Sequence, residues 1–334
     1  MSCPRVQREK AEEVLVGPYG IRAKDSAGRQ LPEEECCIRT CFQRDVDRIT
    51  HCKSFRRLKH KTQVFLQPEG DHYRTRLTHT LEVARLARTV ARALLLNEDL
   101  TEAIALGHDL GHTPFGHAGE RALNRIHAGG FRHYEQSLRV VDLLERDGRG
   151  LNLCLETRMG ILNHTTGAPD DTREATTVRL CDRIAYMNHD LDDAIRAGLL
   201  TEDEVPETIR AGCGTRNSTR INSMISDLIE NSADGEIRMS ERMSEIFRFY
   251  HSFMYAEIYT NPVAKGEEGK VDGILAALYE RYCREPERLP EDFGGVLERE
   301  GVERAVCDYI SGMTDGYAME KYGELFIPFA WTVK

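Results

Sequence analysis

The chain has 334 residues, of which 40% are hydrophobic, enough for one large helical domain with appended parts and a sizeable buried core. Its net charge of −10 argues against a broadly basic nucleic-acid-binding protein, so we do not expect a nucleic acid as substrate. Local cationic pockets for a phosphorylated small molecule remain compatible with that charge. No apolar run approaches the roughly 20 residues of a membrane-spanning helix, and the polar N-terminus lacks a signal-peptide core. We therefore expect a cytoplasmic protein without a membrane partner.

The spacing of the cysteines does not indicate a disulfide framework. Ten of them are scattered along the chain, and none forms a C-x-x-C pair. In a chain of this length, that pattern predicts reduced thiols rather than disulfides. Cys36, Cys37 and Cys41 lie close enough in sequence to suggest half of a zinc site, but no second half follows.

The N-terminal third begins with irregular sequence and then becomes helical. Residues 1–40 are polar and rich in Gly and Pro, which predicts a flexible arm with a short hairpin around Gly28. Residues 40–66 show helical periodicity and carry many cations. Such charge runs are usually solvated helix faces, but in an acidic protein we favour one or two contacts to phosphate. Residues 67–72 predict a turn.

A clear 3.6-residue apolar stripe from Leu77 to Leu95 predicts a helix over 74–96. His79 lies at the edge of that stripe. A lone histidine in such a position is usually a packed core residue, and it gains weight here only because a His-Asp pair follows on the next predicted helix.

The stretch His108–Glu120 is the densest group of chemically reactive side chains in the sequence. It contains three histidines and two carboxylates within thirteen residues. The pair His108-Asp109 ends an apolar periodic run, and two glycines and a proline then break that helix before another begins near His117. An imidazole beside a carboxylate at a helix end is a suitable start for a divalent metal site.

The rest of the chain also reads as helical. Helices are predicted over 117–125, 131–145, 151–163, 175–197, 217–231, 239–259, 271–284 and 299–313, with a loop over 164–172. Because strand signals are nearly absent, the predicted class is all-α. The expected organisation is an N-terminal arm (1–40), a core (41–200) and a C-terminal helical part packed on the core (201–334).

Three predicted helices supply a donor set for one cation. His79, His108, Asp109 and Asp182 together offer two imidazoles and two carboxylates. Such nitrogen and oxygen donors suit Mn²⁺, Mg²⁺, Fe²⁺, Ni²⁺ or Zn²⁺ and leave positions for water and phosphate. The pattern H…HD…D on consecutive helices is far more specific than any of its members.

This pattern resembles the HD-domain metal-dependent phosphohydrolases. The sequence around it narrows the resemblance to the deoxyguanosine triphosphate triphosphohydrolase family, from about residue 15 to 200. The motifs that carry the resemblance lie at 44–49, 54–64, 73–80, 107–120 and 182–186. The resemblance implies an all-α HD-domain bundle with additional C-terminal helices. It also implies hydrolysis of a deoxynucleoside triphosphate to deoxynucleoside and inorganic triphosphate, by a protein that is commonly a homo-oligomer.

The resemblance also implies a role for each matching residue. His79, His108, Asp109 and Asp182 would bind a divalent metal ion, Mn²⁺ or Mg²⁺ first. The implied catalytic residues are His117 with Glu120, and additionally His112 and His133. Arg57, Arg76 and Arg183 would contact phosphates, Gln63 and Asp190 the 3′-hydroxyl, and Tyr186 the deoxyribose. The chain departs from the family at Tyr134, where an Asn is common, and in its short segment 164–174, so the base preference stays open.

Two other interpretations remain. In the first, the chain is another HD phosphohydrolase, such as a nucleotidase or phosphodiesterase. In the second, it is a non-catalytic regulator that binds nucleotide on the same scaffold. Release of tripolyphosphate from a deoxynucleoside triphosphate distinguishes the main prediction from the first. Tight nucleotide binding without turnover in metal-loaded protein would favour the second.

Overall fold

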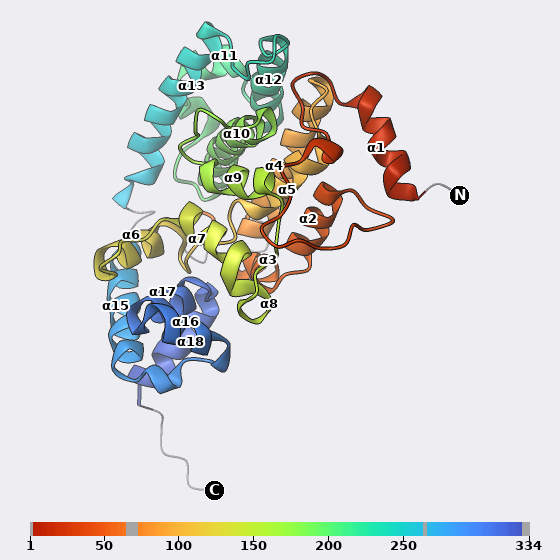
Figure 1. Cartoon of the computed structure of the whole chain (residues 1–334). Coiled ribbons are helices and arrows are strands. Elements are labelled where there is room, and N and C mark those ends of the chain that lie inside the picture. Colours follow the sequence, from red (N-terminus) through yellow and green to blue (C-terminus); the bar gives the residue numbers. More distant parts are fainter. Residues whose placement is uncertain (1–2, 65–72, 263–265, 329–334) are drawn as a thin grey trace, which may run out of the picture.

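The computed structural model describes residues 3–64, 73–262 and 266–328 (Figure 1). In these ranges the chain is helical and forms no β-strand. The only β pairings found there are isolated antiparallel bridges, Arg29 with Cys154 and Thr62 with Thr75. The all-α prediction is thus confirmed. The turn predicted over 67–72 lies outside the described residues. No described helix is both long and apolar enough to cross a membrane.

The α-helices of the described residues follow in chain order. They are α1 (Pro4–Leu15), α2 (Cys41–Thr50), α3 (Lys53–Arg57), α4 (Arg76–Ala93), α5 (Glu98–Gly107), α6 (Gly116–Ile126), α7 (His133–Arg139), α8 (Glu145–Gly148), α9 (Leu155–Asn163), α10 (Arg173–Arg196), α11 (Glu207–Cys213), α12 (Asn217–Glu230), α13 (Glu241–Met254), α15 (Glu268–Arg284), α16 (Gly294–Glu300), α17 (Val302–Ser311) and α18 (Asp315–Phe326). Two π-helical turns, Val140–Leu144 and Tyr255–Tyr259, follow α7 and α13.

The centre of the molecule is a bundle in which α5 packs against α4, α2, α9 and α10 (Figure 1). Helix α4 begins at a capping box in which the Thr75 hydroxyl accepts from the amide of Thr78, and the Asn97 side chain accepts from two amides at the start of α5. Close packing relies on small residues. A Cβ added to Gly107 would lie 2.4 Å from Ile161 Cδ1. The helix predicted over 74–96 is therefore confirmed as α4, the partner of α5.

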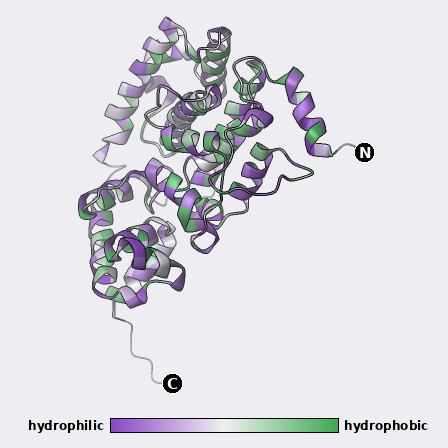
Figure 2. Cartoon of the chain, in the orientation of Figure 1, coloured by the Kyte–Doolittle hydropathy of each residue, from purple (hydrophilic) through white to green (hydrophobic). Residues whose placement is uncertain are grey.

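A second hydrophobic cluster is formed by α6 and the C-terminal helices, which are drawn in blue at the lower left of Figure 1. Helix α6 packs there on α15, which also contacts α17 and α18. By contrast, α11, α12 and α13 share buried residues with the central bundle. The C-terminal part predicted over 201–334 thus contributes to both clusters. Figure 2 shows hydrophilic and hydrophobic residues alternating along the helices, as amphipathic packing requires.

Several local predictions were wrong in detail. Residues 1–40 include helix α1, and Gly28 forms no hairpin but precedes the single bridge from Arg29 to Cys154. The helices predicted over 131–145 and 239–259 are present, and each ends in a π-helical turn that was not predicted. The segment predicted as a helix over 299–313 is split at Gly301, which has φ +86°, into α16 and α17.

Candidate active site and metal centre

Three helices of the central bundle bring the predicted metal ligands together. His79 lies in the first turn of α4, His108 and Asp109 follow the last residue of α5, and Asp182 lies within α10. The side chains of His79, His108 and Asp109 are almost completely buried. Donor atoms of these three residues all lie within 4.8 Å of one another.

The distances between donor atoms suit a single cation. His79 Nε2 lies 3.0 Å from Asp182 Oδ1, and His108 Nε2 lies 3.4 Å from Asp109 Oδ1 and 3.7 Å from Asp182 Oδ1. Neighbouring ligands of an ion with bonds of about 2.1 Å lie roughly 3 Å apart, so the spacing fits. His108 Nδ1 donates to the carbonyl of Ala105, which leaves the lone pair on Nε2. That buried Nε2 has no hydrogen-bond partner among the described residues, as expected of a ligand atom.

The charges around the cluster keep its carboxylates ionised. Burial raises the pKa of Asp109, but His108, His112 and Arg76 outweigh burial and hold that pKa well below its usual range. Arg76 contributes a buried ion pair, with Nη1 2.8 Å from Asp109 Oδ2. Burial also opposes ionisation of Asp182, whose pKa is nevertheless lowered by the hydrogen bond from His79. The cluster therefore presents anionic oxygen ligands.

Three further histidines gather around Glu120. Its carboxylate accepts from Nδ1 of His117 at 3.3 Å and from Nδ1 of His133 at 3.0 Å. The His133 ring stacks on that of His112, with centroids 4.0 Å apart. Burial raises the pKa of Glu120, but the hydrogen bonds from His117 and His133 outweigh burial and lower that pKa far below its usual range. Glu120 therefore stays ionised and orients both rings.

The histidines near Glu120 differ in their burial and in their access to the cavity. Burial, Arg76 and His133 hold the pKa of His112 well below its ordinary value, so His112 is neutral near pH 7. His117 differs because its side chain is 63% exposed and faces the cavity, so it can exchange a proton with a ligand there. His112 Nε2 lies 3.2 Å from Asp109 Oδ1, which joins this group directly to the metal-ligand cluster.

Both groups open into one cavity of about 460 Å³. Its walls combine cations with tyrosines and are contributed by α4, α6, α10, the turn after α13 and the start of α15. The lining includes Arg76, Arg121, Arg183, Tyr186, Asp190, His251, Tyr255 and Tyr259. The Tyr259 hydroxyl donates to Asp190 at 2.7 Å. A cavity lined by candidate metal ligands, cations and aromatic rings has the size and chemistry for a small phosphorylated ligand.

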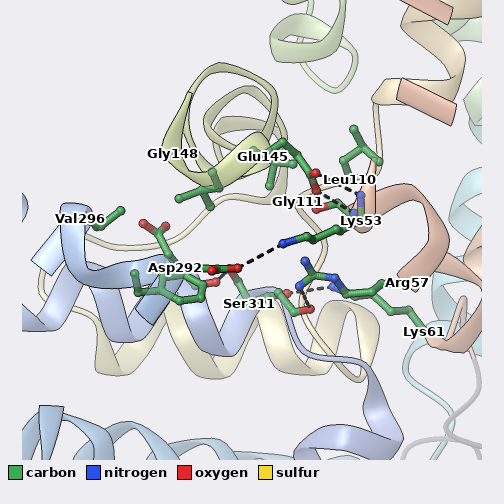
Figure 3. Close-up of a pocket in the computed structure, with 16 residues that line it drawn as sticks. Lys53, Arg57, Lys61, Leu110, Gly111, Glu145, Gly148, Asp292, Val296 and Ser311 are labelled. Carbon is green, nitrogen blue, oxygen red and sulfur yellow. Dashed lines mark hydrogen bonds and ion pairs between the residues drawn. The ribbon is translucent and has the colours of Figure 1, made fainter. Parts of the chain in front are cut away.

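Most of the residues predicted for substrate binding line this cavity: Gln63, Arg76, Arg183, Tyr186 and Asp190. Arg57 does not. Its Nη1 donates to the carbonyl of Gly312 at 2.7 Å, in a second and much smaller pocket near Lys53, Asp292 and Ser311 (Figure 3). Arg57 thus lies outside this cavity and ties α3 to the segment between α17 and α18, and its predicted contact with phosphate stays a prediction.

Sequence reasoning missed several cavity residues. His164 falls in a predicted loop, yet it is buried, with Nε2 3.2 Å from His133 Nε2. Its Nδ1 donates to the carbonyl of Ile161, the same i to i−3 bond that His108 makes after α5. A histidine directly after a helix was thus an available signal. Tyr255 and Tyr259 also line the cavity. Their helical spacing in the sequence is typical of core residues and does not reveal that the turn bearing them borders a cavity.

Comparisons with known proteins show which family the chain belongs to. Residues 76–187 match the HD domain and residues 237–324 match the phosphohydrolase-associated domain. A deoxyguanosinetriphosphate triphosphohydrolase-like protein of Caldanaerobacter subterraneus subsp. tengcongensis is 52% identical over 97% of this chain and 96% of its own. A protein of the same name from Desulfatibacillum aliphaticivorans is 46% identical, over 97% of this chain and 98% of its own.

One solved structure, of a hypothetical protein from Aquifex aeolicus, has a TM-score of 0.48 and 21% identity, covering 85% of this chain and 68% of that one. The sequence relationships are much stronger and extend over nearly the whole of both chains. The chain therefore belongs to the deoxyguanosinetriphosphate triphosphohydrolase-like proteins, a family of HD-domain phosphohydrolases.

Proposed function

We propose that this protein hydrolyses a deoxynucleoside triphosphate to the deoxynucleoside and inorganic triphosphate. The observation that carries the proposal is the single cavity shared by a His/Asp cluster suited to a metal, the His117–Glu120 pair and several arginines. The names of the relatives support the same reaction class, because they refer to deoxyguanosinetriphosphate triphosphohydrolase.

The metal would be held by His79, His108, Asp109 and Asp182, and we propose Mn²⁺ or Mg²⁺ before Fe²⁺, Ni²⁺ or Zn²⁺. When bound, such an ion supplies positive charge against the phosphate oxygens. The carboxylates are already ionised and His108 already directs a lone pair into the cluster.

The proton would be moved by His117. Glu120 accepts from its Nδ1, which leaves Nε2 to face a ligand in the cavity. In the proposed step the oxygen of water forms a bond to the α-phosphorus while the bond to the 5′-oxygen breaks. The 5′-oxygen takes the Nε2 proton of His117, and a proton from the attacking water restores the imidazolium. Proton transfer of this kind contributes about 10²–10⁴-fold to a rate.

The other side chains would bind and orient the substrate. Arg76 and Arg183 supply cations for the phosphates, and Arg183 also lies 5.2 Å from the centre of the Phe247 ring. Tyr186 lies one helical turn from Asp190 and would pack against the deoxyribose, where a 2′-hydroxyl has little room. Gln63 and Asp190 would hold the 3′-hydroxyl.

The test is a panel of deoxynucleoside and ribonucleoside triphosphates with Mn²⁺ or Mg²⁺, with the phosphate products separated by ion chromatography. Tripolyphosphate released from a deoxynucleoside triphosphate is the expected result. His117→Ala should retain metal and lose about 10²–10⁴-fold in kcat, whereas Asp109→Ala should lose the metal itself. His60→Ala is the matched control, because His60 is exposed and outside the cavity.

Other outcomes would replace the proposal. Release of phosphate or pyrophosphate would identify another HD phosphohydrolase, and tight nucleotide binding without turnover in metal-loaded protein would identify a regulator. Wild-type turnover by His117→Ala would refute the role given to His117. The expected homo-oligomer, the cytoplasmic location and the division at residues 40 and 200 stay predictions. Sedimentation of the metal-loaded protein would measure the first of these.

A further inference from the structure

The loop that connects the metal-ligand cluster to His117 has a strained backbone. This loop, residues 112–117, is called the catalytic loop below. Phe115 has φ +64° and Gly116 has φ +57°, two consecutive residues in the left-handed region. Glycine adopts this conformation readily, but for phenylalanine it is energetically unfavourable. Such a residue persists only where its surroundings hold it in place. The direction in which α6 leaves the loop, and thus the position of His117, depends on what holds Phe115.

One carboxylate from the C-terminal cluster holds it. Asp315, the first residue of α18, is 4% exposed. Its Oδ1 accepts from the Phe115 amide at 2.9 Å. Its Oδ2 accepts from the amide of Thr62 at 3.0 Å and from the Thr62 hydroxyl at 2.5 Å. A single side chain therefore bridges two segments that are more than 50 residues apart, and it uses both of its oxygens.

The Thr62 side of this bridge leads to the metal ligands. The Thr62 carbonyl accepts from Arg76 Nε at 3.2 Å, and Nη1 of the same guanidinium lies 2.8 Å from Asp109 Oδ2. Asp315 is thus linked through Thr62 and Arg76 to Asp109, and through Phe115 to the helix that carries His117. Its position fixes the two halves of the site relative to one another.

A buried lysine makes a parallel connection. Lys61 is 3% exposed, and its Nζ donates to the carbonyl of His112 within the catalytic loop and, at 2.9 Å, to the carbonyl of Ser311 at the end of α17. The catalytic loop is therefore attached to the C-terminal cluster at two points, at His112 by Lys61 and at Phe115 by Asp315.

We propose that Asp315 is a positioning residue for catalysis, through which the C-terminal cluster holds the catalytic loop so that His117 faces the metal-bound substrate. The effect of Asp315 on catalysis rests on the proposed function, whereas its role in holding the catalytic loop does not. Asp315 does not line the cavity, so it acts through Phe115 and Thr62 rather than on the substrate.

The test compares Asp315→Asn with Thr314→Ala in the full-length, metal-loaded protein. An amide side chain offers one acceptor oxygen, so the variant Asp315→Asn cannot satisfy both Phe115 and Thr62. The Thr314 hydroxyl caps the same helix by accepting from the amide of Tyr317 and does not touch the catalytic loop. Because misplacement of a reacting group by about 1 Å costs about 10²-fold, we expect kcat to fall at least tenfold in Asp315→Asn with KM nearly unchanged. Thr314→Ala should lower thermal stability and leave kcat within about twofold.

Hydrogen–deuterium exchange gives a readout that needs no turnover. We expect the amides of residue 113 and residues 115–118 to exchange faster in Asp315→Asn than in the wild type. Exchange at the same amides should be unchanged in Thr314→Ala. The variant Thr62→Val removes only the hydroxyl bond to Asp315, so its exchange rates at these amides should lie between those of the other two variants. This variant replaces Asp315→Asn in the test if Asp315→Asn does not fold. Unaltered exchange, or equal losses of kcat in Asp315→Asn and Thr314→Ala, would overturn the inference. If the wild-type protein releases no tripolyphosphate from a deoxynucleoside triphosphate, the proposed function is overturned. The exchange measurement then decides whether Asp315 holds the catalytic loop.

Discussion

Glu174 offers a quantitative test of how the helices that carry the site are held together. It is fully buried near the start of α10, the helix that carries Asp182. Its Oε1 accepts from the amide of Ile21 at 2.9 Å and from the amide of Asn97, the cap of α5, at 2.9 Å. Its Oε2 is buried and has no hydrogen-bond partner among the described residues. Burial outweighs the two amides and raises the pKa of Glu174 to about 7.

The sign and size of the effect follow from this pKa. The folded protein retains the Glu174 proton up to about pH 7, whereas the unfolded chain releases it near the ordinary glutamate value of 4.5. Stability should therefore fall as pH rises from about 4.5 to about 7 and stay level above that. Because each tenfold change in an equilibrium constant is worth about 1.4 kcal/mol, the full effect is about 3 kcal/mol.

The variant Glu174→Gln retains an acceptor oxygen but cannot ionise. We expect the free energy of unfolding of Glu174→Gln, relative to that of the wild type, to rise by about 3 kcal/mol between about pH 4.5 and about pH 8. Urea denaturation of both proteins at several pH values measures this difference, and contributions from other titrating groups cancel in it. A difference that does not change with pH would refute the reasoning.

Further substitutions test the geometry of the site. A Cβ on Gly111 would lie 2.2 Å from the Ser137 amide nitrogen and 2.5 Å from the His133 carbonyl oxygen, so Gly111→Ala should destabilise the protein by about 1–3 kcal/mol and reduce turnover. Gly273→Ala is its control, because no atom lies within 4 Å of the added Cβ, and it should stabilise α15 by about 0.5–1 kcal/mol in a thermal melt. Arg76→Lys should weaken metal binding about 10–100-fold by calorimetry, because an ammonium cannot contact Thr62, Gln63 and Asp109 together. An unchanged affinity would contradict that role.

The sequence predicted best those features that depend on local pattern. The stripe from Leu77 to Leu95 specified α4, because one buried face requires that period. The H…HD…D spacing anticipated which side chains gather, since each lies on, or directly after, a helix of the same bundle. The contact of Arg57 with the distant Gly312 carbonyl could not be predicted, because the basic segment around Arg57 gives no information about it.

Contacts between segments that are distant in the sequence could not be predicted. Asp315 is one acidic residue in a chain that has 55 of them, and its bonds to Phe115 and Thr62 span 200 and 253 positions. Likewise, the π-helical turn that brings Tyr259 to Asp190 has no signature in the sequence. Such contacts are determined by how segments distant in the sequence pack together, which periodicity does not describe.

The division into two clusters has a practical consequence. The metal-ligand candidates belong to the larger central bundle, whereas α6, with His117 and Glu120, packs in the smaller cluster on α15. A smaller core buries less apolar surface and is the first to loosen under mild heating or dilute denaturant. With the proposed roles, a partly damaged preparation would retain its full complement of metal after its turnover had gone. Metal content would then overstate the fraction of active molecules in a purified sample.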